Sequence, residues 1–230
     1  MYESHYVTAL ILAAGMGSRM KAGKNKILLD ISGKSVLSYT VALFGENPLV
    51  DEIIIAAAKN ELETVRKISL AEAKNKPLKI IEGGKDRQES SYLAVREAED
   101  GILLIHDGAR AFTDEKIIND VIRNTEKYGA AAPGIKVTDT VKKASDGMIE
   151  KTVDREALFL IQTPQGFMRD KILKGHEKAR EENIRVTDDT MLLELTGEPV
   201  KITEGSVDNI KLTVKEDIYI AQNIIRKKGR

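Results

Sequence analysis

The sequence predicts an α/β fold: a Rossmann-like, mainly parallel sheet flanked by helices, with a β-hairpin arm projecting from it. Four short apolar runs rich in β-branched residues recur at residues 7–12, 53–57, 79–81 and 101–105. Segments of helical periodicity separate these runs, which is typical of parallel strands joined by crossover helices. Residues 135–152 differ, because polar and apolar residues alternate on both sides of a Ser-Asp-Gly step, and this pattern predicts the hairpin.

Length and composition favour one folded domain spanning residues 1–230. The chain has 230 residues, 42% of them hydrophobic, and carries 36 basic and 36 acidic side chains, so the charge balance indicates neither a nucleic-acid nor a membrane partner. It has no cysteine, which excludes disulfides and thiolate sites and favours a reducing compartment. The N-terminal apolar run is far shorter than the roughly 20 residues that span a bilayer. We therefore expect a cytoplasmic protein.

The clearest helix is predicted after Thr113. This residue is the expected N-cap, two acidic residues follow in the first turn, four apolar residues then share one face, and Gly129 ends the helix. A second helix is expected to follow residues 164–167, and an amphipathic helix with a basic end closes the chain at residues 215–229.

The first strand ends in "LAAGMGSRM", which nearly matches two phosphate-binding fingerprints and fails both. Gly15 and Gly17 fit a dinucleotide motif, but Met20 occupies the place of its third glycine. The P-loop spacing is too long by one residue, and Asn25 stands where serine or threonine is required. The sequence thus disfavours hydride transfer and P-loop chemistry. A strand end with free N–H groups and nearby cations still suits a polyphosphate, although the lysines alone are equally compatible with a solvated surface.

Two later strand ends also carry polar motifs. In "EGGKDRQES" (residues 82–90) the glycines allow a base or ribose to approach the backbone, and Ser90 is expected to donate a hydrogen bond to it; a turn with a helix cap is the simpler alternative. In "LLIHDGAR" we expect Asp107 to hold Mg²⁺ or substrate, and His106 to be structural. Residues 208–213 read as a short edge strand.

Taken in order, "LAAGMGSRM", "GGKDRQES", "HDGAR", "TDT", "VDR", "QTPQGF", "TDD" and "EGSVDNIKLT" resemble the 2-C-methyl-D-erythritol 4-phosphate cytidylyltransferases of the nucleotidyltransferase superfamily. The likeness covers about residues 8–221. It implies transfer of a cytidylyl group from CTP to 2-C-methyl-D-erythritol 4-phosphate, with release of pyrophosphate. The product would be 4-diphosphocytidyl-2-C-methyl-D-erythritol, an intermediate of non-mevalonate isoprenoid biosynthesis.

The same resemblance implies the site residues. Two anions must meet, so catalysis depends on positioning and positive charge. The catalytic residues implied are Arg19, Lys26, Arg155 and Lys211, with Lys26 facing the α-phosphate. The nucleotide-binding residues implied are Ala13, Ala14, Gly15, Gly84, Lys85 and Ser90. The polyol-phosphate pocket would contain Asp107, Arg110, Thr163 and Thr187. The cofactor implied is Mg²⁺ or another divalent cation, held by Asp107 and, with less support, by Asp208.

Members of this family act as homodimers, and the resemblance implies that an arm at about residues 134–154 completes the neighbouring subunit's site. The chain departs from the family around the catalytic lysine, where Asn25 and Ile27 replace the usual proline and glutamine. Loss of the proline predicts a more mobile loop before ligand binds. Assignment of the key cation to Lys26 depends on its spacing from "GSRM".

Three alternatives remain. A ribitol-5-phosphate cytidylyltransferase would share the fold and the chemistry, but Ala14, Asp154 and Asp189 favour methylerythritol as the polyol. A nucleotide-binding regulator without catalysis would be expected to have lost the cation pair or Asp107, and all three residues are present. A purely structural α/β domain would leave the strand-end motifs unexplained.

Overall fold

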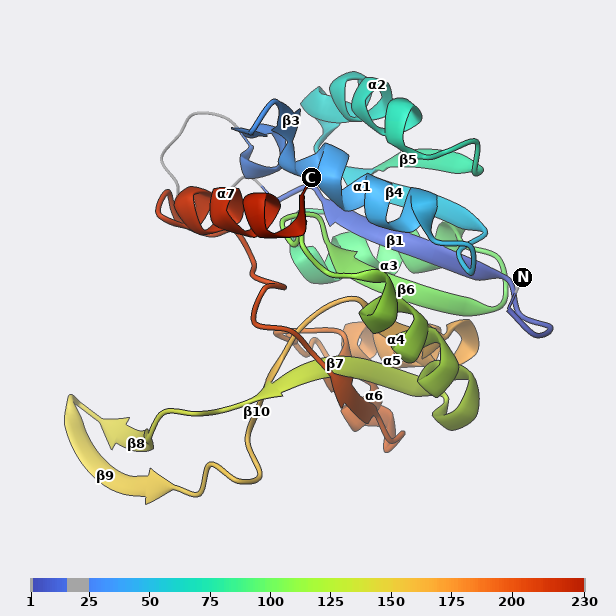
Figure 1. Cartoon of the computed structure of the whole chain (residues 1–230). Helices are drawn as coiled ribbons and strands as arrows, with labels where there is room; N and C mark the ends of the chain where they lie inside the picture. Colours follow the sequence, from blue (N-terminus) through green and yellow to red (C-terminus); the bar gives the residue numbers. More distant parts are fainter. Residues whose placement is uncertain (1, 16–24, 230) are drawn as a thin grey trace.

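The computed structural model describes residues 2–15 and 25–229, and its centre is an eight-stranded sheet (Figure 1). The strand order is β10-β7-β11-β6-β1-β4-β5, with β12 beside β7. The strands that match the four predicted apolar runs are β1 (Val7–Ala13), β4 (Glu52–Ala57), β5 (Leu78–Glu82) and β6 (Ile102–Asp107). These four strands are parallel, so the predicted parallel sheet is confirmed.

The other half of the sheet is mixed. Its strands are β7 (Ala130–Lys136), β10 (Phe159–Ile161), β11 (Gln165–Met168) and β12 (Lys201–Glu204). The strand β11 runs antiparallel to both β6 and β7, and β10 runs antiparallel to β7, whereas β12 is parallel to β7. A small separate ladder pairs β2 (Asp30–Ile31) with β3 (Lys34–Ser35).

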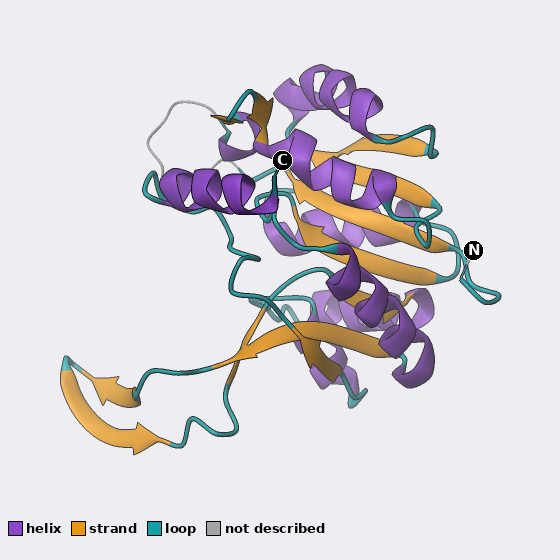
Figure 2. Cartoon of the chain, viewed as in Figure 1, coloured by secondary structure: helices purple, strands orange, loops and turns teal. Residues whose placement is uncertain are grey.

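Helices cover both faces of the sheet (Figure 2). One face packs against α1 (Val36–Glu46), α2 (Leu62–Glu72) and α4 (Glu115–Tyr128). The other face packs against α3 (Arg87–Glu97), α5 (Arg169–Glu181) and α6 (Thr190–Thr196). The closing helix α7 (Asp217–Lys228) buries its apolar face against a third cluster around Phe112. Because β1 is covered on both faces, all seven of its residues are buried, which explains its unbroken apolar run.

The predicted hairpin is confirmed and projects away from the sheet (Figure 1). Its strands are β8 (Val141–Ser145) and β9 (Met148–Val153). The two residues between them, Asp146 and Gly147, have positive φ angles of 49° and 79°. A two-residue turn with both φ angles positive matches the twist of the flanking strands, which is why an Asp-Gly step closes a hairpin here.

Two local predictions were wrong. The N-cap of α4 is Asp114, whose carboxylate accepts a hydrogen bond from the Ile117 amide at 3.0 Å; Thr113 lies one residue too early and is buried. Gly129 does end the helix, in the left-handed conformation. Residues 208–213 form a loop rather than an edge strand. The buried side chain of Asn209 holds this segment through a hydrogen bond to the Thr163 carbonyl, in place of a ladder of backbone hydrogen bonds. Within the described residues, no helix is long and apolar enough to cross a membrane.

Candidate active site

A cavity of about 240 Å³ lies where β1, β5 and β6 end at their carboxyl edges. Ligands bind at this edge of parallel sheets, since the loops that leave adjacent strands converge there. Its walls come from the end of β1, from the short 3-10 helix η1 (Lys26–Leu28), from the loop after β5 and from the loop after β6. The lining residues are Leu12, Ala13, Ala14, Gly15, Lys26, Ile27, Gly84, Lys85, Asp86, Arg87, Ser90, Asp107, Gly108, Ala109 and Lys211.

The loop after β5 is shaped by glycine and by one serine. A Cβ atom added at Gly83 would lie 2.4 Å from the Cβ of Ala14, so only glycine lets this loop approach the end of β1. The Ser90 hydroxyl accepts a hydrogen bond from the Gly84 amide at 3.0 Å and donates one to the Asp86 carbonyl at 2.8 Å. Ser90 therefore fixes the loop, as expected from the simpler alternative of a turn with a helix cap, and its hydrogen bond to a base or ribose stays a prediction.

Asp107, at the end of β6, is the central carboxylate of the site. Lys211 Nζ lies 2.7 Å from one of its oxygens and Arg110 Nε 3.7 Å from the same oxygen, while Arg87 Nε lies 3.1 Å from the other. Burial raises the pKa of Asp107, but the charges of Arg87, Lys211 and Arg110 lower it by more, so the net pKa lies far below its usual range. Asp107 is therefore ionised at all physiological pH values.

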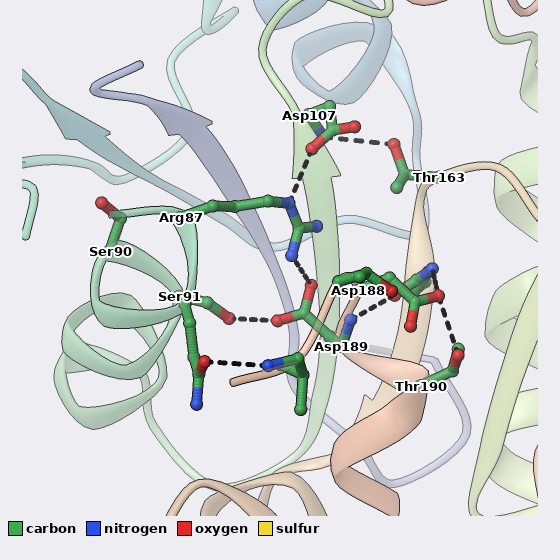
Figure 3. A network of polar contacts seen from close by, with 12 residues as sticks. Arg87, Ser90, Ser91, Asp107, Thr163, Asp188, Asp189 and Thr190 are labelled. Atoms are coloured by element: carbon green, nitrogen blue, oxygen red, sulfur yellow. Dashed lines mark hydrogen bonds and ion pairs between the residues drawn. The ribbon is translucent and has the colours of Figure 1, made fainter. Parts of the chain in front are cut away.

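Arg87 joins this carboxylate to a second, deeper one (Figure 3). Its Nη1 lies 2.7 Å from the Oδ2 of Asp189, which is fully buried. The Ser91 hydroxyl donates a 2.6 Å hydrogen bond to the other oxygen of Asp189. Burial lowers the pKa of the Arg87 guanidinium, and the two carboxylates raise it by more, so the pKa is raised overall. Arg87 is thus held as a fixed cation on the cavity wall.

His106 has the structural role that the sequence predicted. It is fully buried; its Nε2 lies 2.8 Å from the Arg110 carbonyl, and its Nδ1 lies 3.0 Å from the Thr163 hydroxyl. Phe44 packs on the ring edge-on at a centroid distance of 5.1 Å. Burial lowers the pKa of His106 to about 4, so the ring is neutral near pH 7.

The loop that carries Lys211 is anchored by Asn209 and Leu212. The Asn209 side-chain amide is fully buried and donates to the Thr163 carbonyl at 2.9 Å, and the Leu212 amide donates to the Ala109 carbonyl at 3.0 Å. Arg110 Nη1 donates to the Asn209 carbonyl at 2.6 Å. These contacts hold the loop against the end of β6 and so place Lys211 beside Asp107.

Most of the residues singled out in the sequence are brought together. Nine line the cavity: Ala13, Ala14, Gly15, Lys26, Gly84, Lys85, Ser90, Asp107 and Lys211. Arg110 and Thr163 lie beside them, since Arg110 faces the Asp107 carboxylate and the Thr163 hydroxyl accepts a hydrogen bond from the Asp107 amide at 3.1 Å. Arg19 lies outside the described residues.

Three of the predicted site residues, Arg155, Thr187 and Asp208, lie outside the cavity wall. Arg155 is exposed beside the hairpin and donates to the Thr138 carbonyl. Thr187 is exposed, and its hydroxyl donates to the Met191 sulfur at 3.1 Å. Asp208 forms an ion pair with a lysine of α7, with a distance of 2.9 Å between Asp208 Oδ2 and that lysine's Nζ. None of the three is among the residues that line the cavity.

Sequence reasoning missed Arg87 and Asn209. The only local signal for Arg87 was an arginine at the start of a predicted helix, three residues after Gly84, and its two carboxylate partners are distant in the chain. Asn209 looked like an ordinary strand residue. In both cases the role depends on a contact between distant segments.

Asp107 is suited to a divalent cation in one respect. Mg²⁺ commonly takes one or two protein carboxylates and completes its shell with phosphate oxygens and water. Asp107 is ionised and lines the cavity, so it fits as a single protein ligand. Among the residues that the structure describes, no three or more His, Cys, Asp or Glu side chains lie together so that they could hold a metal ion.

Comparisons with known proteins agree with this geometry. Residues 7–227 match the family model described as "IspD: 2-C-methyl-D-erythritol 4-phosphate cytidylyltransferase". A protein of that name from Clostridium acetobutylicum is 47% identical over 95% of this chain and 97% of its own length, and one from Clostridium perfringens is 44% identical over 96% and 99%.

Solved structures show the same likeness. A 4-diphosphocytidyl-2C-methyl-D-erythritol synthase from Anaerococcus prevotii has a TM-score of 0.86 and 30% identity, covering 96% of each chain. A 2-C-methyl-D-erythritol 4-phosphate cytidylyltransferase from Thermus thermophilus has a TM-score of 0.80 and 29% identity, covering 96% of this chain and 99% of that one. A family model that spans nearly all of the chain and relatives of this identity lead to one conclusion: the chain belongs to the 2-C-methyl-D-erythritol 4-phosphate cytidylyltransferase family.

Proposed function

We propose that the chain transfers the cytidylyl group of CTP to 2-C-methyl-D-erythritol 4-phosphate. An oxygen of the polyol phosphate forms a bond to the α-phosphorus of CTP, the bond from that phosphorus to the bridging β-oxygen breaks, and pyrophosphate leaves. The observation that carries the proposal is the cavity at the strand ends, where four cations, Lys26, Lys85, Arg87 and Lys211, line one small space. A triphosphate and a second phosphate need such charge in order to meet.

The positions of these cations support separate roles. Lys26 follows β1 and shares the cavity wall with Ala14 and Gly15, so it is proposed to face the α-phosphate. Lys211 enters from the loop before α7, beside Asp107, and is proposed to hold the attacking polyol phosphate. Arg19 is proposed, from the family resemblance, to hold the triphosphate.

We propose Mg²⁺, or another divalent cation, as the cofactor, with Asp107 as the protein residue that would hold it. When bound, such an ion neutralises phosphate oxygens. The residues of the chain then have their own tasks: Arg87 fixes the Asp107 carboxylate from one side and Lys211 from the other. Asp208 is a weaker candidate, because its carboxylate is paired with a lysine and does not line the cavity.

We propose a homodimer in which the hairpin of one subunit supplies Arg155 to the other. Two observations support this arrangement. Arg155 does not line the cavity of its own chain, and β9 presents two large apolar side chains to solvent, Met148 at 74% and Ile149 at 67% exposure. A second copy of the chain would cover such a surface. Thr187, also exposed, is proposed from the family resemblance to bind the polyol phosphate.

We further propose that the chain works as one domain with an arm at residues 134–154, and in the cytoplasm. The location is argued from the substrates, since two highly charged phosphate esters do not cross a membrane unaided.

The decisive experiment measures pyrophosphate release with CTP and Mg²⁺, offering 2-C-methyl-D-erythritol 4-phosphate and ribitol 5-phosphate in parallel. Selective release with the former supports the proposal. Release with ribitol 5-phosphate would keep the chemistry and change the acceptor. Binding of CTP without release from either acceptor would favour a regulatory role for the chain.

A further inference from the structure

Asn25, the residue immediately before Lys26, has a buried side chain whose amide makes three contacts. Its side chain lies at the N-cap of η1, and the residue is only 5% exposed. The Nδ2 atom donates to the carbonyl of Ala13 at 3.1 Å and to Oε2 of Glu61 at 2.7 Å. The Oδ1 atom accepts from the Ile27 amide at 3.4 Å. Both hydrogens and the oxygen of the amide are therefore used.

These contacts tie three separate segments together. Ala13 is the last residue of β1, Ile27 lies within η1, and Glu61 lies in the 3-10 helix η2 (Lys59–Glu61) that leads into α2. The bond to Glu61 joins a neutral donor to a carboxylate, which makes it stronger than a bond between neutral groups. Since Lys26 is the first residue of η1 and lines the cavity, the anchor acts directly beside the proposed catalytic cation.

We propose that Asn25 is a positioning residue: its bonds to Ala13 and Glu61 hold Lys26 in place on the cavity wall. This inference rests on the proposed role of Lys26 at the α-phosphate. The backbone supports it, because the φ angle of Asn25 is −62°, the value that a proline ring fixes covalently. Where a proline would stiffen the chain through its ring, this chain holds residue 25 through a buried amide, so the greater mobility predicted from the loss of the proline is not expected at this residue.

The chemistry of the amide allows a sharp set of variants. Asn25→Ala removes all three contacts and is expected to lower kcat about 10- to 100-fold, with a smaller effect on the KM for CTP, since a misplaced cation is lost from the transition state. Asn25→Asp keeps the shape but turns carboxylate oxygens toward Glu61 and the Ala13 carbonyl, so its loss should be at least as large. Asn25→Pro keeps a φ angle near −62° but removes the same three contacts, so its kcat should fall like that of Asn25→Ala if the side-chain bonds hold Lys26; a normal kcat in Asn25→Pro would show that the φ angle alone is sufficient and would overturn the role of the bonds.

Exchange of the hydrogen-bonding groups tests the Glu61 contact. In Asn25→Asp/Glu61→Gln the new glutamine amide can donate to the new carboxylate, so kcat should recover about tenfold over Asn25→Asp, the size of one charge-assisted hydrogen bond. Glu63→Ala is the matched control, because it removes an exposed acidic residue two positions after Glu61, in the first turn of α2, and should leave kcat unchanged.

Two outcomes separate the inference from the function on which it rests. If Asn25 acts through Lys26, Asn25→Ala should change kcat less than about twofold in a Lys26→Ala background, as expected for coupled residues. A full additional loss in that background, or a normal kcat in Asn25→Ala beside a collapsed Lys26→Ala, would overturn the positioning role alone. A normal kcat in Lys26→Ala would instead reject the proposed role of Lys26, and absence of pyrophosphate release from the unaltered chain would reject the proposed function. If Asn25→Ala fails to fold, Glu61→Ala, measured in the same cycle, gives the same decision.

Discussion

The buried ion pair between Arg87 and Asp189 predicts a large loss of stability in Asp189→Asn. The substitution keeps the size and shape of the side chain, and the new amide oxygen can still accept the Ser91 hydroxyl. It removes the negative charge 2.7 Å from Arg87 Nη1, at a site where the carboxylate has no solvent exposure. Asp189 does not line the cavity, so the substitution changes none of the side chains that line it.

The magnitude follows from burial and from the remaining partner. Removing one member of a buried ion pair typically costs about 3–5 kcal/mol, since the other charge is left uncompensated. Arg87 keeps its contact with Asp107 at 3.1 Å, and its side chain is 28% exposed, so the expected loss lies near the lower value, about 3 kcal/mol. For a chain of this length that loss lowers the melting temperature by roughly 6–12 °C.

The control is another Arg–Asp pair of similar geometry that differs in burial. Arg169 Nη1 lies 3.1 Å from Oδ1 of Asp100, whose side chain is 91% exposed. Exposed pairs contribute about 0–1 kcal/mol, so Asp100→Asn should change little. Urea unfolding of both variants, followed by circular dichroism at pH 7, gives the two free energies. Equal small losses in the two variants would refute the reasoning, because burial would then not decide the strength of the pair.

Three further predictions follow from the site and its supports. Lys26→Ala should reduce kcat by about 10²–10³-fold with an unchanged melting temperature, since it removes a charge that stabilises the transition state. Steady-state pyrophosphate assays of Lys26→Ala and Lys24→Ala test this, and a loss of activity in Lys24→Ala alone would show that Lys24, and not Lys26, is the key cation. The free energy of unfolding should fall as the pH drops from about 6.5 to about 4. Burial lowers the pKa of His106 and of His176 to about 4 in the folded chain, so the unfolded chain takes up these protons first. Urea titrations at several pH values test this, and equal stability across that pH range would contradict it. Asp114→Ala should cost about 1 kcal/mol in urea unfolding, and no loss would argue against Asp114 as the helix cap.

Motifs and periodicity were sufficient to predict the parallel strands, the hairpin and the loops that form the cavity. The four apolar runs became parallel strands because both faces of the central sheet are covered, so every position along β1 is buried. The Asp-Gly step predicted the hairpin because two successive positive φ angles suit those residues. The strand-end motifs predicted which loops meet, since neighbouring parallel strands end at one edge of the sheet.

Local patterns were less reliable where several residues could play the same part. Thr113 and Asp114 are both good N-cap residues; in the structure Asp114 takes this role and Thr113 is buried. Residues 208–213 have the composition of a strand, yet the Asn209 side chain binds Thr163, and the segment became a loop.

The sequence by itself determined the family, the parallel half of the sheet, the hairpin and most of the cavity wall, because these depend on periodicity, on turn chemistry and on motifs that lie within a few residues of one another. The mixed half of the sheet, with β7, β10, β11 and β12, was visible only in the structure. Only the tertiary structure decided that Arg87 bridges Asp107 and Asp189, and that Asn25 binds Glu61. The partners in these contacts lie 20, 102 and 36 residues apart in the chain. Charges and amides pair with whatever the fold brings within about 3 Å, and no local pattern specifies which distant group that will be.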